Sequence, residues 1–177
     1  MRNHMLRASS GRIEVVGVAE VQGASAPASI TLTFPTRTLA TDIIFIHVLY
    51  ENSNVSRPAL SGFTIINSRN GTIAGTATTQ IFYQGSSAAS SIEITVGTFL
   101  AATISCVVLR NCSSTAVSET MTNTTSTTNL TVSSYSVADN EVGVFFMGYD
   151  GLGGRELDNP YTMDADFDAT TINGEGT

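Results

Sequence analysis

Apolar and polar residues alternate along much of the chain, which is the pattern of β-strands that bury one face. The clearest run is Ile30–Phe34, in which three apolar side chains alternate with threonines before Pro35. Residues 43–50 (IIFIHVLY) are apolar almost throughout, which predicts a central strand covered on both faces. Further strands are expected at Ile13–Val18, Phe63–Ile66, Thr79–Gln84, Ser91–Val96, Ala101–Arg110, Leu130–Val132, Glu141–Tyr149 and, as an edge strand, Ala165–Ala169.

The segments between these runs are turns and loops rather than helices. Asn70-Gly71 has the composition of a tight turn, and residues 113–136 contain 15 Ser or Thr, which indicates a long polar connection. Amphipathic helices that could link parallel strands are missing from the pattern. The sequence therefore predicts an all-β fold, a single antiparallel β-sandwich of jelly-roll-like type with about eight to ten short strands.

The composition agrees with one globular domain. The chain has 177 residues, of which 42% are hydrophobic and 13% charged, and its eight cationic residues are all Arg. A chain of this length buries a sizeable core without disulfides or metals. We expect a basic N-terminal arm at residues 1–12, the sandwich at residues 13–149, and an acidic C-terminal segment at residues 150–177 that holds the edge strand.

Charge is distributed unevenly along the chain. The net charge is −7, yet residues 1–12 contain three Arg and no acid, whereas residues 139–177 contain one Arg and nine acids. An acidic surface repels phosphate backbones, so nucleic-acid binding is not expected. The two ends could pair with neighbouring subunits, or they could simply be solvated. The candidate interface residues are Arg2, Arg7 and Arg12.

Neither export nor membrane insertion is expected. The N-terminal sequence MRNHMLRASSGR lacks the apolar region of a signal peptide, and the longest apolar stretches are too short to span a membrane. Cys106 and Cys112 would be about 20 Å apart on one extended strand, against a limit of about 7 Å for a disulfide. Reduced thiols are therefore expected, and a turn near Arg110-Asn111 is the alternative that would bring them closer.

The residues of common catalytic sites are scarce. Without Lys there is no P-loop and no Schiff-base chemistry, and no G-x-S-x-G nucleophile motif occurs. His4 belongs to the N-terminal arm, and His47 lies inside an expected strand, where a buried structural histidine is the ordinary outcome. We expect no enzymatic activity, no catalytic residue and no cofactor.

Asp164, Asp166 and Asp168 form the one suggestive group of acids. Alternate strand positions share a face, so the three carboxylates would follow one another at about 7 Å. Calcium prefers clustered oxygen ligands. The stronger interpretation is that these charges protect a solvated edge strand from pairing with another chain, so no metal is expected and calcium is the lesser alternative.

Several segments between Ala28 and Cys112 occur in the order of a known family. They are Asp42–Ile46, Pro58–Thr64, Ile81–Gly85 and Ala101–Asn111. This order resembles the small β-sandwich domains of tailed-phage structural proteins, which contain an Asp-led apolar strand, a proline loop followed by Gly-Trp-Thr, a strand of the form YYK-A, and a last strand ending in Tyr-Arg-Gly. Here Phe63 replaces Trp, Gln84 replaces Lys and Gly85 replaces Ala. The resemblance covers about two thirds of the chain.

The resemblance implies a virion protein without catalytic residues. Such domains occur in capsid decoration proteins and in tail, collar or fibre subunits, commonly as trimers. Because the pattern shows no coiled-coil or β-helical shaft, we expect a decoration (cement) protein on the outer surface of a phage head. It would be made in the host cytoplasm and bind the major capsid protein or other virion subunits as a homotrimer.

Two other functions stay open. A receptor- or glycan-binding module of a tail, collar or fibre is the first, although the absence of Trp removes the residue on which sugar rings most often stack. An enzyme such as a glycan depolymerase is the second and the less favoured.

Overall fold

The structure, a computed structural model, describes residues 2–7, 12–24, 29–50, 57–73, 76–95, 101–113, 119–121 and 141–146. These ranges contain ten strands and no helix, and every strand pair is antiparallel, which confirms the predicted all-β fold. The strands are β1 (Arg2–Arg7), β2 (Glu14–Ala24), β3 (Ser29–Thr33), β4 (Ile43–Tyr50), β5 (Phe63–Ile73), β6 (Thr76–Gly85), β7 (Ser91–Thr95), β8 (Ala101–Arg110), β9 (Glu119–Met121) and β10 (Glu141–Phe146).

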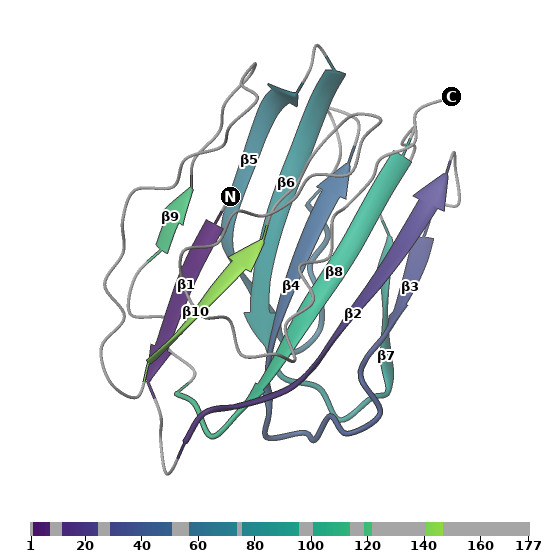
Figure 1. Cartoon of the computed structure of the whole chain (residues 1–177). Helices are drawn as coiled ribbons and strands as arrows, with labels where there is room; N and C mark the ends of the chain where they lie inside the picture. The colour runs from purple at the N-terminus through teal and green to yellow at the C-terminus, as the bar shows by residue number, and fades with distance from the viewer. Residues whose placement is uncertain are drawn as a thin grey trace.

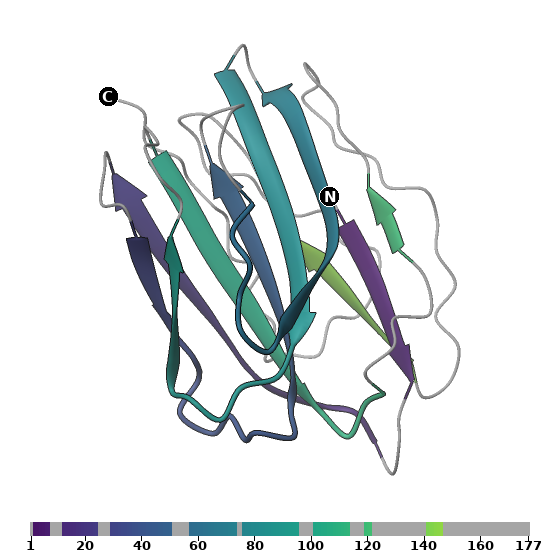
Figure 2. The ribbon, with the colours of Figure 1, turned by 180° about the vertical axis from the view of Figure 1, so that it is seen from behind.

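The strands form a central sheet with a smaller sheet on each side. The central sheet has the order β2-β8-β4-β6-β5, and the smaller sheets have the orders β3-β7 and β10-β1-β9. In Figure 1 the β10-β1-β9 sheet lies in front of the central sheet. The β3-β7 sheet lies behind it and faces the viewer in Figure 2. The sandwich therefore has covering strands on both faces of its central sheet.

Strand β4 shows why the central sheet is covered twice. Its side chains from Ile44 to Leu49 are all buried, as the continuous apolar run predicted. Ile44, Ile46 and Val48 pack toward β3 and β7, whereas Phe45 packs on the opposite face. Since successive strand residues point to opposite faces, a strand that is apolar at every position needs a cover on each side.

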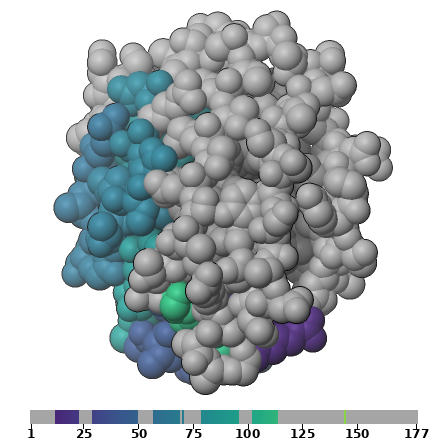
Figure 3. Space-filling model, turned by 90° about the vertical axis from the view of Figure 1, so that its left-hand side faces the viewer, coloured from purple at the N-terminus to yellow at the C-terminus, as the bar shows by residue number. Residues whose placement is uncertain are grey.

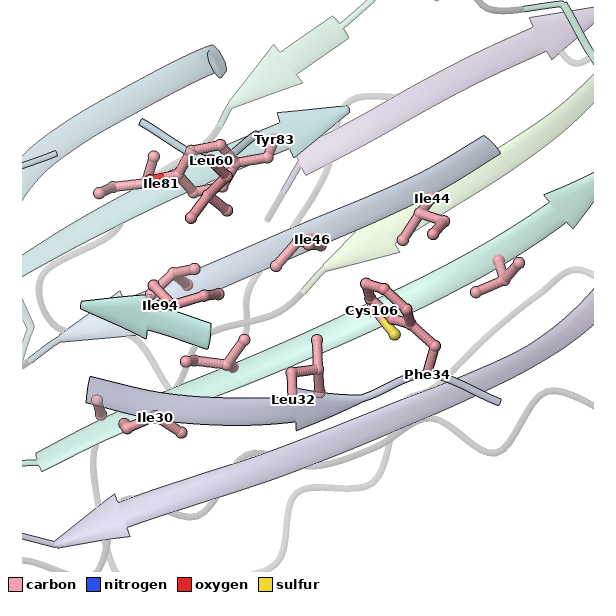
Figure 4. Packing of buried hydrophobic residues seen from close by; sticks show 14 of the residues in the cluster. Ile30, Leu32, Phe34, Ile44, Ile46, Leu60, Ile81, Tyr83, Ile94 and Cys106 are labelled. Carbon is pink, nitrogen blue, oxygen red and sulfur yellow. The ribbon is translucent and has the colours of Figure 1, made fainter. Parts of the chain in front are cut away.

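The larger core lies between the central sheet and β3-β7, and we call it the β3–β7 core. Figure 4 shows its side chains converging from β3, β4, β6, β7 and β8. Its buried members are Val16, Ile30, Leu32, Phe34, Ile44, Ile46, Val48, Leu60, Ile81, Tyr83, Ile94, Ala102, Ile104, Cys106 and Val108. Burying each large aliphatic side chain contributes about 1.5–3 kcal/mol, so this core is the main source of stability among the described residues.

A second core, which we call the β10 core, lies on the other face. It consists of Phe45, Phe82, Val107, Leu109 and Val144. Val144 comes from β10 and is fully buried, so it anchors the outer sheet to the central one. The strand expected at Glu141–Tyr149 thus exists in the described part as β10.

The prediction of a tight turn at Asn70-Gly71 is wrong. Strand β5 continues through both residues to Ile73, and β6 begins only at Thr76, so the chain reverses after Ile73. Asn70 stands opposite Thr79, whose hydroxyl donates a hydrogen bond to the Asn70 side-chain oxygen at 3.2 Å. The Asn side chain is used across the strand pair, and a glycine is tolerated because β5 is the last strand of the described sheet.

The N-terminal segment expected as an arm contains a strand. Residues 2–7 form β1, which pairs with β10 and with the short β9 inside the Ser/Thr-rich connection. The expected strands Leu130–Val132 and Ala165–Ala169 lie outside the described residues. Within the described ranges there is also no helix of the length and hydrophobicity that a membrane crossing requires.

Candidate functional site

The most developed polar arrangement surrounds Asp42, at the end of the connection between β3 and β4. The chain turns here through hydrogen bonds from the Thr38 amide to the Pro35 carbonyl and from the Asp42 amide to the Leu39 carbonyl, both 3.0 Å. The Leu39 amide in turn donates to Asp42 Oδ2 at 2.8 Å. Aspartate is common at such turns because its carboxylate accepts nearby backbone hydrogen bonds. The turn places the Asp42 side chain in a fully buried position.

Arg110, the last residue of β8, binds the buried carboxylate through two parallel hydrogen bonds. Its Nε donates to Asp42 Oδ1 and its Nη2 to Oδ2, each at 2.8 Å. The same Nη2 donates to the carbonyl of Arg37 at 2.8 Å. This geometry, in which two N–H groups of one guanidinium bind the two oxygens of one carboxylate, is among the stronger hydrogen-bonding arrangements in proteins. We refer to it as the Asp42–Arg110 bridge.

Glu14, the first residue of β2, connects the bridge to the surface. Its carboxylate lies 3.8 Å from Nη1 of Arg110 and accepts a hydrogen bond from Nη2 of Arg37 at 2.9 Å. The Arg37 side chain is 68% exposed, so this outer pair is screened by solvent. The start of β2, the β3–β4 connection and the end of β8 therefore meet at the lower end of the molecule (Figure 3).

The electrostatics of the Asp42–Arg110 bridge favour the charged form of both side chains. Burial alone would raise the pKa of Asp42, but the hydrogen bonds from Arg110 and the Leu39 amide, together with the Arg110 charge, bring that pKa below its ordinary value. The hydrogen bond to Asp42 raises the pKa of Arg110. A carboxylate with occupied lone pairs and a lowered pKa is a poor general acid or base. The arrangement is therefore suited to fastening three chain segments together.

A second polar group crosses the central sheet as a row of opposed residues. Glu20 pairs with Ser105, Ser105 with His47 and His47 with Phe82, on β2, β8, β4 and β6. His47 is fully buried, and its ring stacks on Phe82 with 4.5 Å between centroids. This matches the sequence interpretation of a buried strand histidine.

The order of this row does not suit proton relay. In a Ser-His-acid triad the histidine stands between the other two groups, whereas here Ser105 stands between Glu20 and His47. The Glu20 carboxylate accepts one hydrogen bond from Gln22, and its Oε2 is buried without a partner among the described residues. Desolvation raises the pKa of Glu20.

Sequence reasoning missed both arrangements for one physical reason. The partners are distant in the chain, and the strand order that brings β2, β8 and β4 together is not encoded in local periodicity. The available hints were an aspartate directly before the apolar run of β4 and an arginine at the end of β8.

The expected interface residues lie on β1 and just before β2. Arg2 and Arg7 stand at the ends of β1, opposite Phe146 and Glu141 of β10. Arg12 is exposed just before β2, and its carbonyl accepts a hydrogen bond from Nδ2 of Asn111 at 3.4 Å.

The cysteines are free thiols on opposite faces of the central sheet. Cys106 belongs to the β3–β7 core and Cys112 packs against the β10 core. The chain does bend between them, since Asn111 has a φ of 61°. Burial raises the pKa of Cys106 to about 12 and that of Cys112 to about 11.

Metal binding finds no support in the part of the chain that the structure describes. No group of three or more His, Cys, Asp or Glu side chains suited to a metal ion occurs there. The calcium candidates Asp164, Asp166 and Asp168 lie outside the described residues, so that prediction stays a prediction.

Comparison with protein-family models, curated proteins and solved structures found no match to this chain, so any function must be argued from its own residues.

Proposed function

We propose that this chain is a non-enzymatic structural protein of a phage virion, most specifically a capsid decoration protein that stabilises the head through contacts with the major capsid protein. The proposal includes a homotrimeric state and assigns no catalytic residue. It starts from the resemblance of four segments to the sandwich domains of tailed-phage structural proteins. The all-β sandwich fold is compatible with it.

The observation that carries the proposal is that residues of the resembling segments contact one another. Asp42, which opens the first segment, and Arg110, which lies near the end of the last one, form the Asp42–Arg110 bridge. Tyr83 of the third segment, Ile81–Gly85, donates a hydrogen bond of 2.8 Å to the carbonyl of Pro58, which opens the second segment. Because these residues of the motif bind one another in the folded chain, they would be expected to occur together wherever this fold occurs.

The departures from the family pattern also lie together. A Cβ atom placed on Gly85 would come within 2.1 Å of the Gly62 carbonyl oxygen and 2.7 Å of Cδ1 of Phe63. An alanine at position 85, as in the family pattern, would therefore clash with this loop unless the loop shifted. Phe63, which replaces Trp, stands directly opposite Gly85 in the strand pair and is the second neighbour that this Cβ would meet.

The proposed role is tested by counting copies on the particle. Quantitative mass spectrometry of purified virions that carry this chain should give a copy number in fixed ratio to the major capsid protein, at the symmetry sites of the head. A handful of copies per particle, located at the tail, would overturn the proposal and favour the receptor- or glycan-binding alternative.

A binding experiment tests the interface candidates. The purified chain is added to particles that lack it, and the bound amount is compared between wild type and the Arg12→Gln variant. Arg12 is exposed and belongs to the basic N-terminal region, so its loss should weaken binding. Arg57→Gln removes another exposed arginine elsewhere and is the matched control. Equal binding by both variants would remove Arg12 from the interface.

A further inference from the structure

Strand β5 contains two adjacent residues, Asn70 and Gly71, that can react with each other. Joining the side-chain carbon Cγ of Asn70 to the backbone nitrogen of Gly71 closes a ring of low strain. Glycine leaves that nitrogen accessible because it has no Cβ. Asn70 is exposed, and β5 is the last strand of the described central sheet, so water reaches the side chain.

The side-chain oxygen of Asn70 accepts two hydrogen bonds that activate the neighbouring carbon. The Thr79 hydroxyl donates to it at 3.2 Å, and Nη2 of Arg57 donates to it at 3.4 Å. Thr79 is fully buried on β6, so its hydroxyl is held in place. Attack on an amide carbon moves negative charge onto its oxygen, and donors already bound to that oxygen stabilise the charge. The two contacts therefore favour attack at Cγ of Asn70.

Opening of one end of the β5–β6 strand pair is enough for this ring to form. In the paired strand the Asn70 side chain stands away from the plane of the sheet, whereas the Gly71 N–H lies in it. The pairs beyond Asn70 are Gly71–Thr78, Thr72–Ala77 and Ile73–Thr76, and they lie where β5 ends beside the start of β6 (Figure 1). Element ends open at far less cost than the whole domain. The pair of Asn70 with Thr79 is then kept, and so are the two donors.

We propose that Asn70 is a site of spontaneous deamidation, in which Gly71 supplies the nucleophile and water supplies the new oxygen. The Gly71 nitrogen loses its proton to hydroxide and bonds to Cγ of Asn70. The bond from Cγ to the side-chain nitrogen then breaks, and ammonia leaves. Water opens the cyclic imide at Cγ to give aspartate, or at the main-chain carbonyl to give isoaspartate, so the net change replaces NH2 by OH. This inference rests on the contacts around β5 and is independent of the proposed virion function.

The surroundings of Asn70 accommodate the aspartate product. Aspartate keeps the backbone spacing of β5, whereas isoaspartate adds a carbon atom to the main chain and shifts the pairs beyond it. The new carboxylate takes the place of the amide beside Thr79 and Arg57. The present Arg57 contact of 3.4 Å is long for a hydrogen bond, and an ionised acceptor makes such a bond shorter and stronger. Deamidation therefore converts a neutral position into an anion that Arg57 can bind.

Peptide mapping of the folded, purified chain tests the reaction. Trypsin cuts after Arg69 and Arg110, and residues 70–110 contain no Asn besides Asn70. The protein is incubated at pH 7 and at pH 8.5, and mass spectrometry follows the fraction of this peptide that has gained the mass difference between OH and NH2. Fragment spectra locate the gain. The rate should rise by up to about tenfold per pH unit, because the deprotonated fraction of the Gly71 nitrogen rises in that proportion.

Two controls identify the route and the place. Gly71→Ala adds a Cβ beside the attacking nitrogen and should slow the conversion several-fold. Asn67 lies three residues further into β5, is followed by Ser68 and stands opposite Phe82, so it should stay unchanged over the same period. The chain unfolded in urea gives the rate without any strand pairing.

Each result decides for or against the site. Conversion of Asn70 in the folded chain, slowed in Gly71→Ala, supports it. Conversion in urea with none in the folded chain overturns it, because the strand pair then protects Asn70 completely. Equal rates for wild type and Gly71→Ala overturn it as well, because attack by the Gly71 nitrogen is then not the route.

The Asn70→Asp variant provides the aspartate product directly and tests the role of Arg57. The pKa of its new carboxylate, measured by NMR titration, should be higher when Arg57→Gln is added, because a nearby cation lowers the pKa of a carboxylate. Arg37→Gln is the matched control, since Arg37 lies by the opposite end of the central sheet, and it should leave that pKa unchanged. The same pKa with and without Arg57 would show that Arg57 does not bind the product.

Discussion

Asp42 combines complete burial with a full charge, which proteins tolerate only when the charge is well satisfied. Three hydrogen bonds supply that satisfaction: two from Arg110 and one from the Leu39 amide. Removing the carboxylate would leave the guanidinium and the amide facing a space without an acceptor. The free-energy cost therefore comes mainly from the groups left behind.

Asp42→Ala should lower the free energy of unfolding by about 2–3 kcal/mol, the scale of losing a charge-assisted hydrogen bond in a shielded site. Arg37→Gln is the matched control, since this side chain is 68% exposed and its pair with Glu14 should be worth about 0.5 kcal/mol or less. Urea denaturation of both variants measures the difference. Equal losses would show that the bridge is no more important than a surface pair.

The two shifted carboxylates should act on stability with opposite dependence on pH. Because the pKa of Asp42 is lowered, its stabilising effect is present above the unfolded pKa of about 4 and is lost as the pH falls through the folded value. Because the pKa of Glu20 is raised, the folded state resists its ionisation, and stability falls as the pH rises through about 4 and above.

Asp42→Asn should therefore be less stable than wild type at pH 7, with a difference that shrinks toward pH 3. Glu20→Gln should be at least as stable as wild type at pH 7, with its advantage disappearing toward pH 3. Urea midpoints at pH 7, 5, 4 and 3 test both expectations. If the urea midpoints of wild type, Asp42→Asn and Glu20→Gln changed with pH in the same way, the assigned pKa shifts would be contradicted.

Among the elements, those with strong periodicity were the ones predictable from sequence. Ile30–Phe34 and residues 43–50 became β3 and β4 because apolar side chains at every second position, or at every position, have few other ways to be buried. The sequence pattern failed at Asn70-Gly71, where a local turn preference was outweighed by eleven residues of continuous strand in β5. It also could not show that β1 pairs with β10, because that pairing joins residues more than 130 positions apart.

The sequence drew attention to both residues of the Asp42–Arg110 bridge but did not predict that they contact each other. Each residue stood in a segment that the family resemblance picked out, yet nothing local said that the two would meet. Their pairing follows from β8 lying beside β4 in the sheet, and that order is a property of the whole fold.

At the last residue of β6, which stands opposite the first residue of β5, Gly85→Ala should lower the free energy of unfolding by about 1–3 kcal/mol, the usual cost of overpacking. The added Cβ would meet the Gly62 carbonyl oxygen at 2.1 Å, and a backbone atom cannot move aside as a side-chain end can. Ser86→Ala, at the exposed neighbouring position, should change stability by less than about 0.5 kcal/mol. Thermal or urea unfolding of the two variants measures the difference. Similar stabilities would disprove the close approach of Gly85 to the Gly62 carbonyl oxygen.

For the molecule as a whole, the two cores share the same strands. Strands β4, β6 and β8 each send alternate side chains into the β3–β7 core and the β10 core. One core cannot be disrupted without disturbing strands that also form the other. The described domain should therefore unfold as a single cooperative unit.

The natural thiols allow a direct test, because Cys106 reports on one core and Cys112 on the other. Pulsed alkylation across a urea series, read by mass spectrometry of the two peptides, should give coincident transitions. The labelling rate of both thiols in the native state should be low, since burial raises their pKa values to about 12 and about 11. A lower midpoint for Cys112 would show that the β10 side opens first.

The Asp42–Arg110 bridge also has a mechanical consequence. It ties the connection before β4 to the last residue of β8, a strand that is hydrogen-bonded to a neighbour on each side. A pulling force on the loop at residues 35–42 would pass through two parallel hydrogen bonds directly into the middle of the central sheet. The loop and the sheet would then bear the load together, and the loop would not peel away first.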